Sequence, residues 1–454
     1  MLNFKLSRLM LGSVLLASFV GCSSDSDEDT TTQYSYFQYY NASANSTLTA
    51  LVLDDYTYSG IDFADAIPRY SYSEGSSEVS ILGLDEDGNS VELLEADTQF
   101  DLDTEHLFVL YGDFHTPQLL DLQFNREDMD DLNDDEDNDY SKMQVLIANV
   151  SAEDSSYDAY ISLATQSFTE ATALGNVGYG EYSQEQVFDT GEYLIYLTEP
   201  GSSEVIYTTS IMGLTDNTAY KMLIRPSFGV GELKLVIDSV DSTTTVQSYP
   251  ALESLASINI YNGLDSQDVD IQIASQQETQ FVYDIQPFSL SEFQNMGYND
   301  YAVSGVSSAD DSSLFDNVLV TFNQDEVYTL IVYSEDDTVK TMAVSHDLRP
   351  RPYESLVAIT NLVDVADNLA VYFVRDSETI ETAQYQMTDI DFEEQQSELI
   401  PHGDYDISIV KTDDNGTQTL MYQSESFEFN GDSNYQFILV PDSTSSFGHR
   451  LTLL

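Results

Sequence analysis

One strand pattern recurs along this chain, and it is most complete between Met143 and Asp238. Apolar and polar residues alternate there over runs of about five to eight positions, which is the period of a strand with one buried face. Turn-forming residues separate the runs, and hardly any stretch shows the period of an amphipathic helix. The pattern predicts an all-β fold of short antiparallel strands, arranged as an immunoglobulin-like β-sandwich. A closed barrel is the structural alternative.

Three landmarks indicate that this pattern occurs four times. The opening strand of each copy ends in an Asn, namely Asn41, Asn149, Asn262 or Asn361. A late strand begins with an aromatic residue, namely His106, Tyr220, Tyr328 or Tyr435. A hairpin signal precedes the late strand, namely Asp87-Gly88, Pro200-Gly201, Asp310-Asp311-Ser312 or Asn415-Gly416. A period of about 100 residues is too long for solenoid units and fits whole domains in a row.

We therefore predict four tandem antiparallel immunoglobulin-like β-sandwich domains. They cover residues 35–125, 143–240, 255–346 and 355–454. Residues 126–142 form an acidic linker by composition, and residues 23–34 form a disordered polar tether. The seam Asp347–Glu354 (DLRPRPYE) contains two Pro residues, which should hold the last two domains at a fixed angle. Because the seams are polar, we also expect residues 143–240 to fold alone.

The N-terminal residues predict where the protein is sent in the cell. Residues 1–22 contain a short positive region and an apolar run of about a dozen residues, too short for an ordinary membrane span. Its end, Phe19-Val20-Gly21-Cys22, resembles a bacterial lipobox in which Phe19 replaces the usual Leu, and this implies a lipid on Cys22, the sole cysteine. Ser23 follows, which by the usual sorting pattern favours the outer membrane, with the periplasmic or surface face left open. An ordinary signal peptide with an incidental Cys is the alternative.

The second repeat is similar to a bacterial secreted domain, the domain-of-unknown-function family 4397. The matching motifs are Asn149, Tyr179-Gly180-Glu181, Gly191-Glu192-Tyr193 and Thr218-Ala219-Tyr220. In the fourth repeat the matches are Asn361, Gly403-Asp404-Tyr405 and Tyr435. The first and third repeats keep the two ends of the pattern and lose its middle. The resemblance implies a β-sandwich in envelope-associated proteins, and it implies no activity and no catalytic residues.

Charge limits the partners of this protein. The sequence has 14 Lys and Arg against 80 Asp and Glu, which gives a formal net charge of -66. Such a field repels nucleic acid and anionic lipid, so we expect no nucleic-acid partner. A solvated acidic surface adapted to salt is one interpretation, and a specific cation-binding role is the other.

Few groups of residues in the sequence suggest a catalytic or metal-binding site. The sequence contains no metal-binding H-E-x-x-H, no G-x-S-x-G elbow and no P-loop, and we predict no enzyme and no cofactor. Within the acidic run, Asp131, Asp135, Asp137 and Asp139 offer the hard oxygen ligands that suit Ca²⁺. The run lacks the turn Gly and the distal Glu of a calcium loop. It is therefore either a solvated linker or a weak Ca²⁺ site.

The predicted function is that of a non-catalytic cell-envelope lipoprotein with a structural, spacer or adhesive role. The alternative is a surface module that binds carbohydrate or a small ligand, assisted by calcium. A cluster formed by Tyr34, Tyr36, Tyr39 and Tyr40 could stack on sugars, although alternation places some of these rings in the core. The membrane is the expected partner through the lipid anchor, and the protein or glycan partner is left open.

Overall fold

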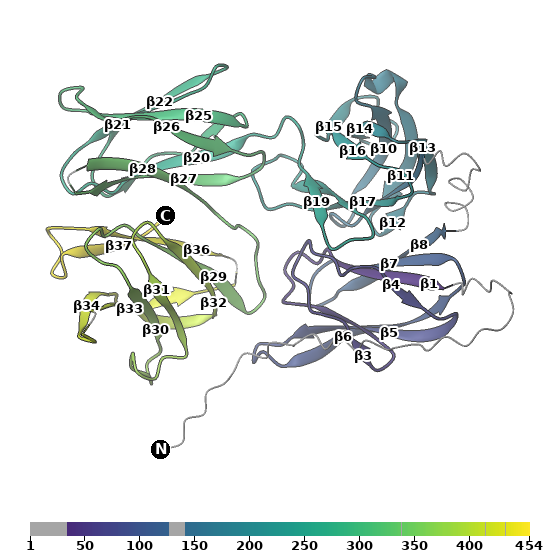
Figure 1. The fold of residues 1–454 in the computed structure, drawn as a ribbon, viewed down its shortest axis with the longest axis horizontal. Coiled ribbons are helices and arrows are strands. Elements are labelled where there is room, and N and C mark those ends of the chain that lie inside the picture. The colour runs from purple at the N-terminus through teal and green to yellow at the C-terminus, as the bar shows by residue number, and fades with distance from the viewer. Residues whose placement is uncertain (1–33, 127–140, 337, 414, 432) are drawn as a thin grey trace, which may run out of the picture. The chain divides into compact units, whose positions relative to one another are not determined.

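The computed structural model describes residues 34–126, 141–336, 338–413, 415–431 and 433–454. Within these residues nearly all regular structure is β-strand, alongside a short 3-10 turn, η1 (Phe168–Glu170). The strands form eight sheets, and each sheet takes its strands from one stretch of sequence. We call the four successive stretches segments 1 to 4. Each contributes two sheets, drawn as two layers in Figure 1. The all-β prediction is confirmed.

The strands of segment 1 are β1 (Ser35–Asn41), β2 (Ala50–Leu53), β3 (Tyr56–Thr57), β4 (Tyr70–Tyr72), β5 (Gly75–Leu84), β6 (Ser90–Phe100), β7 (Thr104–Tyr111) and β8 (Gln118–Asn125). Those of segment 2 are β9 (Lys142–Asn149), β10 (Ser156–Leu163), β11 (Thr172–Gly178), β12 (Glu181–Tyr182), β13 (Gln186–Asp189), β14 (Gly191–Thr198), β15 (Val205–Thr208), β16 (Met212–Leu214), β17 (Ala219–Pro226), β18 (Leu235–Val240) and β19 (Val246–Tyr249).

The strands of segment 3 are β20 (Ala256–Asn262), β21 (Val269–Ala274), β22 (Thr279–Ile285), β23 (Ser289–Leu290), β24 (Gln294–Met296), β25 (Asn299–Ser307), β26 (Ser313–Phe322), β27 (Val327–Glu335) and β28 (Thr338–Ser345). Those of segment 4 are β29 (Glu354–Asn361), β30 (Leu369–Val374), β31 (Tyr385–Ile390), β32 (Gln395–Pro401), β33 (Gly403–Thr412), β34 (Gln418–Gln423), β35 (Phe427–Phe429), β36 (Tyr435–Pro441) and β37 (His449–Leu453).

One sheet of each segment, which we call the opening sheet, contains the opening strand and the late strand. The opening sheets have the orders β4-β1-β7-β8, β12-β9-β17-β18-β19, β23-β20-β27-β28 and β32-β29-β36-β37. The other sheet, the partner sheet, has the order β3-β2-β5-β6, β11-β10-β14-β15, β22-β21-β25-β26 or β31-β30-β33-β34. Four segments with the same connectivity account for the repeated landmarks of the sequence.

The sequence analysis predicted only antiparallel pairs, and this is wrong for one pair of strands in each segment. The opening strand pairs in parallel with the late strand in every segment, for example with Tyr39 opposite Phe108 in segment 1. Parallel neighbours need a long crossover rather than a hairpin. Here the strands of the partner sheet lie between them in the chain and form that crossover. All other pairings between named strands are antiparallel within the described residues.

The opening sheets are buried on both faces. Along β7, Phe108 and Leu110 point into the core of segment 1, whereas Leu107 and Val109 belong to a second cluster. That second cluster also contains residues of segment 2, namely Leu146, Ala148, Val150, Leu223 and Val240. The opening sheets of segments 1 and 2 therefore pack on each other. Sheets packed face to face in this way form a continuous apolar core.

Segments 3 and 4 repeat this arrangement. On β27, Leu330 and Val332 face the core of segment 3, and Ile331 and Tyr333 face segment 4. Their partners in segment 4 are Leu362, Ile438 and Val440. The same kind of sheet thus forms both joints. We use the word joint for the interface between the opening sheets of segments 1 and 2, or of segments 3 and 4.

The four landmark Asn residues end their strands with one shared turn. Each is buried, and its side-chain oxygen accepts the backbone N–H two residues further on. The Asn41 amide also donates to Ser46 Oγ at 2.8 Å, and the Asn361 amide donates to the Ala366 carbonyl at 2.6 Å. Asn suits such turns because its side chain can imitate a backbone peptide. The landmark is therefore structural.

The late Tyr residues share a second structural role. The hydroxyl oxygens of Tyr220, Tyr328 and Tyr435 each accept the backbone N–H five residues upstream, at 2.9, 3.3 and 3.3 Å. A Tyr that bonds back to the preceding corner is typical of β-sandwiches. His106, in the same place in segment 1, is fully buried, and its Nδ1 lies 2.9 Å from Asp121. The aromatic landmark fixes the entry to the late strand.

The hairpin signals lie where the sequence predicts them. Gly88, Gly201 and Gly416 have φ values of 75°, 74° and 81° and link β5 to β6, β14 to β15 and β33 to β34. In segment 3, Asp311 takes the left-handed conformation with φ 57° in the turn between β25 and β26. Asp tolerates this conformation better than most residues, which is why the third turn needs no Gly.

Candidate functional site at the joints between segments

The centre of the first joint holds a buried carboxylate, Glu105 on β7. Its side chain is 1% exposed and forms an ion pair with Lys221 on β17, which is also 1% exposed. Arg69 and Arg126 approach the other oxygen of Glu105 at 3.1 and 3.0 Å. The amide oxygen of Gln38 accepts a further hydrogen bond from Lys221 at 3.3 Å. Segments 1 and 2 are thus linked by charge inside an apolar interface.

The electrostatics of this cluster favour the ionised form of Glu105. Burial by itself would raise the pKa of the carboxyl, because it disfavours the charged form. The Lys221 charge, followed by those of Arg69 and Arg126, outweighs burial and holds the pKa of Glu105 at about 2, below its ordinary value of 4.5. The carboxylate is therefore charged at any physiological pH.

A second polar cluster lies at the same joint. Asp238 on β18 is fully buried and accepts hydrogen bonds from Tyr40 of segment 1 at 2.6 Å and from Arg225 at 2.5 Å. The Arg225 guanidinium also lies over the ring of Phe63 in segment 1, 5.0 Å from its centroid. Burial and then the Asp238 charge raise the pKa of Tyr40 far above its ordinary value. Tyr40 therefore remains a neutral donor.

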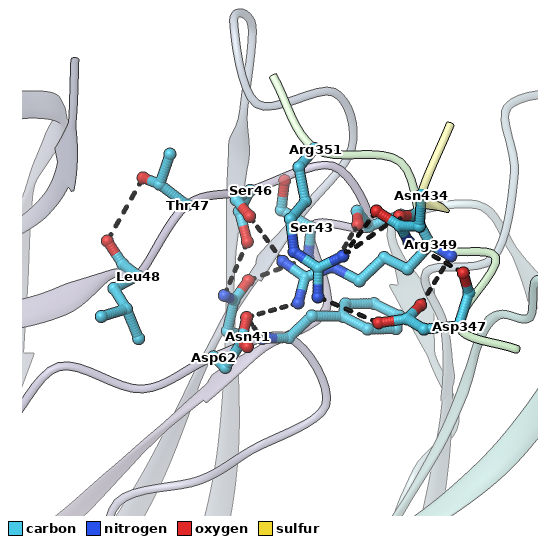
Figure 2. A network of polar contacts seen from close by, with 12 residues as sticks. Asn41, Ser43, Ser46, Thr47, Leu48, Asp62, Asp347, Arg349, Arg351 and Asn434 are labelled. Atoms are coloured by element: carbon cyan, nitrogen blue, oxygen red, sulfur yellow. Dashed lines mark hydrogen bonds and ion pairs between the residues drawn. The ribbon is translucent and has the colours of Figure 1, made fainter. Parts of the chain in front are cut away.

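Arg349, in the seam between segments 3 and 4, reaches into segment 1. Figure 2 shows its guanidinium between Asp62 and the loop after Asn41. It donates to the carbonyls of Ala44, at 2.9 Å, and Ser46, and it pairs with Asp62. It also lies 5.1 Å from the centroid of the Phe63 ring. Phe63 therefore contacts two cations, Arg349 and Arg225, from different parts of the chain.

Asn434 of segment 4 fixes the seam that carries Arg349. Its amide donates to the carbonyls of Asp347 and Arg349, both at 2.9 Å. Its side-chain oxygen accepts the backbone N–H of Leu356 at 2.9 Å. Arg351 pairs with Asp347 at 3.0 Å. The seam is therefore held on both sides, which presents the Arg349 side chain to segment 1 in one orientation.

Eight of the twelve Lys and Arg residues in the described part of the chain lie at these contacts. The residues concerned are Arg69, Arg126, Lys221, Arg225, Lys340, Arg349, Arg351 and Arg450. Lys340 of segment 3 pairs with Glu393 of segment 4 at 3.0 Å, and Arg450 of segment 4 lies over Phe288 of segment 3 at 4.3 Å. In a chain of net charge -66, these cations sit where two acidic segments would otherwise repel each other.

The hollow beside Arg349 offers little chemistry. It measures about 380 Å³, and its lining includes Asp62, His346, Asp347 and Arg351. His346 contacts Thr329 Oγ1 through Nε2 at 2.8 Å, and burial lowers its pKa below the ordinary value. The charged groups that we describe around Arg349 bond to one another. The arrangement therefore suits holding segments together rather than activating a substrate.

None of the site residues predicted from sequence falls within the part of the chain that the structure describes. Cys22 and the acidic run with Asp131, Asp135, Asp137 and Asp139 lie outside the described residues. Within the described part of the chain, no group of three or more His, Cys, Asp or Glu side chains could hold a metal ion. None of the helical structure described there is long and apolar enough to cross a membrane.

Two of the four tyrosines that could have stacked on sugars face the interior, as alternation had predicted for some of them. Tyr39 and Tyr40 are fully buried, in the segment 1 core and at the first joint respectively. Tyr36 is partly buried beneath the guanidinium groups of Arg69 and Arg126. Both faces of β1 are covered, so this strand offers no continuous ring surface.

Sequence reasoning missed the joint residues altogether. A signal was present, because any Lys or Arg in so acidic a chain is unusual. Arg349 lies between Leu348 and Pro350 in the seam that was interpreted only as a stiff linker between the last two domains. Lys221 interrupts an otherwise apolar late strand. A buried cation in such a strand needs an anionic partner, and that partner came from another segment.

Comparison with known proteins adds little. No protein-family model matches the chain, and no curated protein matches it. One similar solved structure is the Bacillus anthracis TIE protein, with 9% identity over 87% of this chain and 68% of that chain, at a TM-score of 0.15. Another is CBMbc (family CBM26) from Eubacterium rectale Amy13K in complex with maltoheptaose, with 12% identity over 44% and 96%, at 0.16. A third is BcpA, the major pilin subunit of Bacillus cereus, with 8% identity over 66% and 98%, at 0.14. Likenesses at this level carry no information about function.

Proposed function

We propose that this protein is a non-catalytic lipoprotein of the bacterial outer membrane, with four tandem immunoglobulin-like sandwiches that act as a stiff structural spacer. The observation that carries the proposal is the burial of the opening sheets against each other at both joints. A flexible chain of independent domains would keep these faces polar. Apolar joints with internal ion pairs instead resist bending between segments, which suits a protein that holds a binding surface away from the membrane.

The proposed location in the cell envelope rests on the N-terminal sequence. The charged and apolar signal-like segment, Cys22 as the sole cysteine and Ser23 after it support an outer-membrane lipid anchor. The similarity of the Asn, Gly-x-Tyr and late-Tyr motifs to family 4397 supports an envelope-associated domain. Two acyl chains anchor a protein stably, whereas one alone gives reversible binding.

Cys22→Ala should release the protein from the membrane fraction or leave it unprocessed. Fractionation of cells that express the variant, with metabolic labelling by a palmitate analogue, measures this directly. Ser23→Ala is the matched control and should remain labelled and membrane-bound. A Cys22→Ala protein that is still processed, labelled and sedimented with membranes would contradict the proposed anchor.

Arg349→Lys should loosen the contact between segment 1 and the seam. Lysine keeps the charge but cannot donate to Ala44, Ser46 and Asp62 together, because it lacks the planar fork of the guanidinium. We expect a cost of about 1.5–3 kcal/mol, the range for hydrogen bonds to charged groups. Hydrogen exchange of the peptide that spans residues 41–49 should become faster. Lys411→Arg is a conservative control away from this contact, and equal exchange in all three proteins would refute the role of Arg349.

The exposed rings of β22 favour a second candidate function, a surface that binds carbohydrate or a small ligand. This function is compatible with the first, because a stiff spacer needs a surface to present. Calcium assistance through Asp131, Asp135, Asp137 and Asp139 remains part of this alternative.

A further inference from the structure

The outer face of the segment 3 partner sheet carries large apolar side chains that the described part of the chain leaves exposed. Phe281 and Tyr283 on β22 are 49% and 63% exposed. Their rings are parallel within 3°, with centroids 5.9 Å apart. On β26, at the opposite edge of the sheet, Leu319 is 71% exposed. Both edge strands of this face (labelled in Figure 1) therefore present apolar groups to solvent.

Between them, the two central strands carry the small side chains Ala274 and Ala302 at one end of this face. Ala274 lies opposite Ala302, and Ala302 lies opposite Leu319. Gln272 lies opposite both Phe281 and Ser304. Large groups at the edges and small groups in the centre make a shallow groove. A hollow of about 460 Å³ lies on the Leu319 side of this face; its lining includes Ala274, Ala302 and Leu319, and does not include Phe281 or Tyr283.

Segment 2 shows what a covered version of this face looks like. There Tyr160 and Tyr196 occupy the outer face, and Phe168 from η1 packs on both rings, with centroids 5.2 and 5.4 Å away. In segment 3 the corresponding connection between β21 and β22 is the four-residue turn 275–278, which carries no aromatic residue. The groove is thus open because the covering element is absent from this copy.

The charge around the groove selects its ligand. The four strands contain Asp270, Asp284, Asp300 and Asp316 and no Lys or Arg. An anionic ligand would be repelled there. Hydroxyl groups are suitable partners, because carboxylates and the side-chain oxygens of Gln272 and Ser304 accept hydrogen bonds from them. Flat aromatic faces carry partial negative charge and attract the C–H faces of a sugar ring.

From these observations we propose that this face binds a neutral hexose polysaccharide, laid across the sheet against Phe281 and Tyr283. The inference rests on the proposed function, in that it supplies the surface that the spacer presents. The two exposed rings form an apolar ridge along β22 that sugar units can contact. Gln272 and Ser304 lie beside the ridge and fix the orientation of the hydroxyl groups.

Affinity electrophoresis of the full chain in gels containing soluble starch, hydroxyethylcellulose or galactomannan tests this proposal. At least one polysaccharide should retard the protein, and the double variant Phe281→Ala/Tyr283→Ala should weaken that retardation by about tenfold or more, as expected for the loss of two anchor residues. The matched control is Phe293→Ala/Tyr298→Ala, which removes the same two residue types from other exposed positions of segment 3, 54% and 46% exposed. This control should bind normally.

Three outcomes would overturn the proposal. They are no retardation by any of the three polysaccharides, equal retardation of both double variants, or stronger binding of polylysine than of polysaccharide at the same rings. The last result would assign the groove to a cationic partner. None of them affects the Arg349 or Cys22 experiments, so failure of the groove is distinguishable from failure of the spacer function.

Discussion

Glu105→Gln should lower the free energy of unfolding at the first joint by about 3–5 kcal/mol, the usual cost of breaking a buried ion pair from one side. Lys221 is 1% exposed and would be left in an apolar interface without its carboxylate. Lys221→Met should cost less, because Arg69 and Arg126 would still neutralise Glu105. The two substitutions differ in cost because, among the described residues, Glu105 has three cationic partners, whereas Lys221 has one carboxylate partner.

Native-state hydrogen exchange of the peptides 104–111 and 219–226 in the full chain measures this opening free energy locally. Glu92→Gln, an exposed Glu on β6, is the matched control and should lie within about 0.5 kcal/mol of the parent protein, as surface substitutions do. If Glu105→Gln behaves like this control, the buried charge does not stabilise the joint.

The Glu105 carboxylate makes the stability of the joint depend on pH in the acid range. Because the pKa of Glu105 in the folded protein, about 2, is below its ordinary value of 4.5, its contribution to stability is complete above about pH 4.5. That contribution is lost as the pH falls from 4.5 towards 2, at no more than about 1.4 kcal/mol per pH unit. The difference between the parent protein and Glu105→Gln should therefore shrink over this window and stay constant above it.

A fragment of residues 141–251 should not fold cooperatively on its own. Without segment 1, the fragment exposes Leu146, Leu223 and Val240, and burying such side chains contributes about 1.5–3 kcal/mol each. It also leaves Lys221 without Glu105. Together these losses are comparable to the whole stability of a small domain. The polar seams had suggested the opposite, that residues 143–240 fold alone.

Circular dichroism and a thermal melt of fragment 141–251 test this expectation against a fragment of residues 34–251. The longer fragment should melt cooperatively, and the shorter one should be unfolded or self-associated through its exposed sheet face. A monomeric 141–251 fragment with a cooperative melt close to that of the longer fragment would show that the joint is dispensable.

Local features of the fold could be predicted from the sequence because they depend on neighbouring residues. The turn after Asn149 and the corner at Tyr220 follow from side chains that bond within six residues. One equivalent was missed: Tyr301 donates to the Gly297 carbonyl at 2.8 Å, as Tyr193 and Tyr405 donate four residues upstream. The Gly of Gly-x-Tyr is replaced by Asn299 there, which concealed the match.

The joints could not be predicted, because alternation of apolar and polar residues identifies only strands that have one buried face. A strand buried on both faces gives a nearly continuous apolar run instead. Such a run is present in β27, where Leu330, Ile331 and Val332 are consecutive and fully buried. The run indicates a central layer, but it does not say which sheet covers the second face. That information depends on contacts between residues far apart in sequence, such as Tyr40 and Asp238.

Cleavage between segments 1 and 2 tests the central claim most directly. A protease site placed within residues 127–140 would cut the chain between β8 and β9 without changing either side of the joint. After cleavage, gel filtration in physiological salt should show the two pieces eluting together at the volume of the uncut protein, because the sheet faces and the Glu105–Lys221 pair still hold them. Separate elution of the pieces would contradict a stiff spacer built on buried joints.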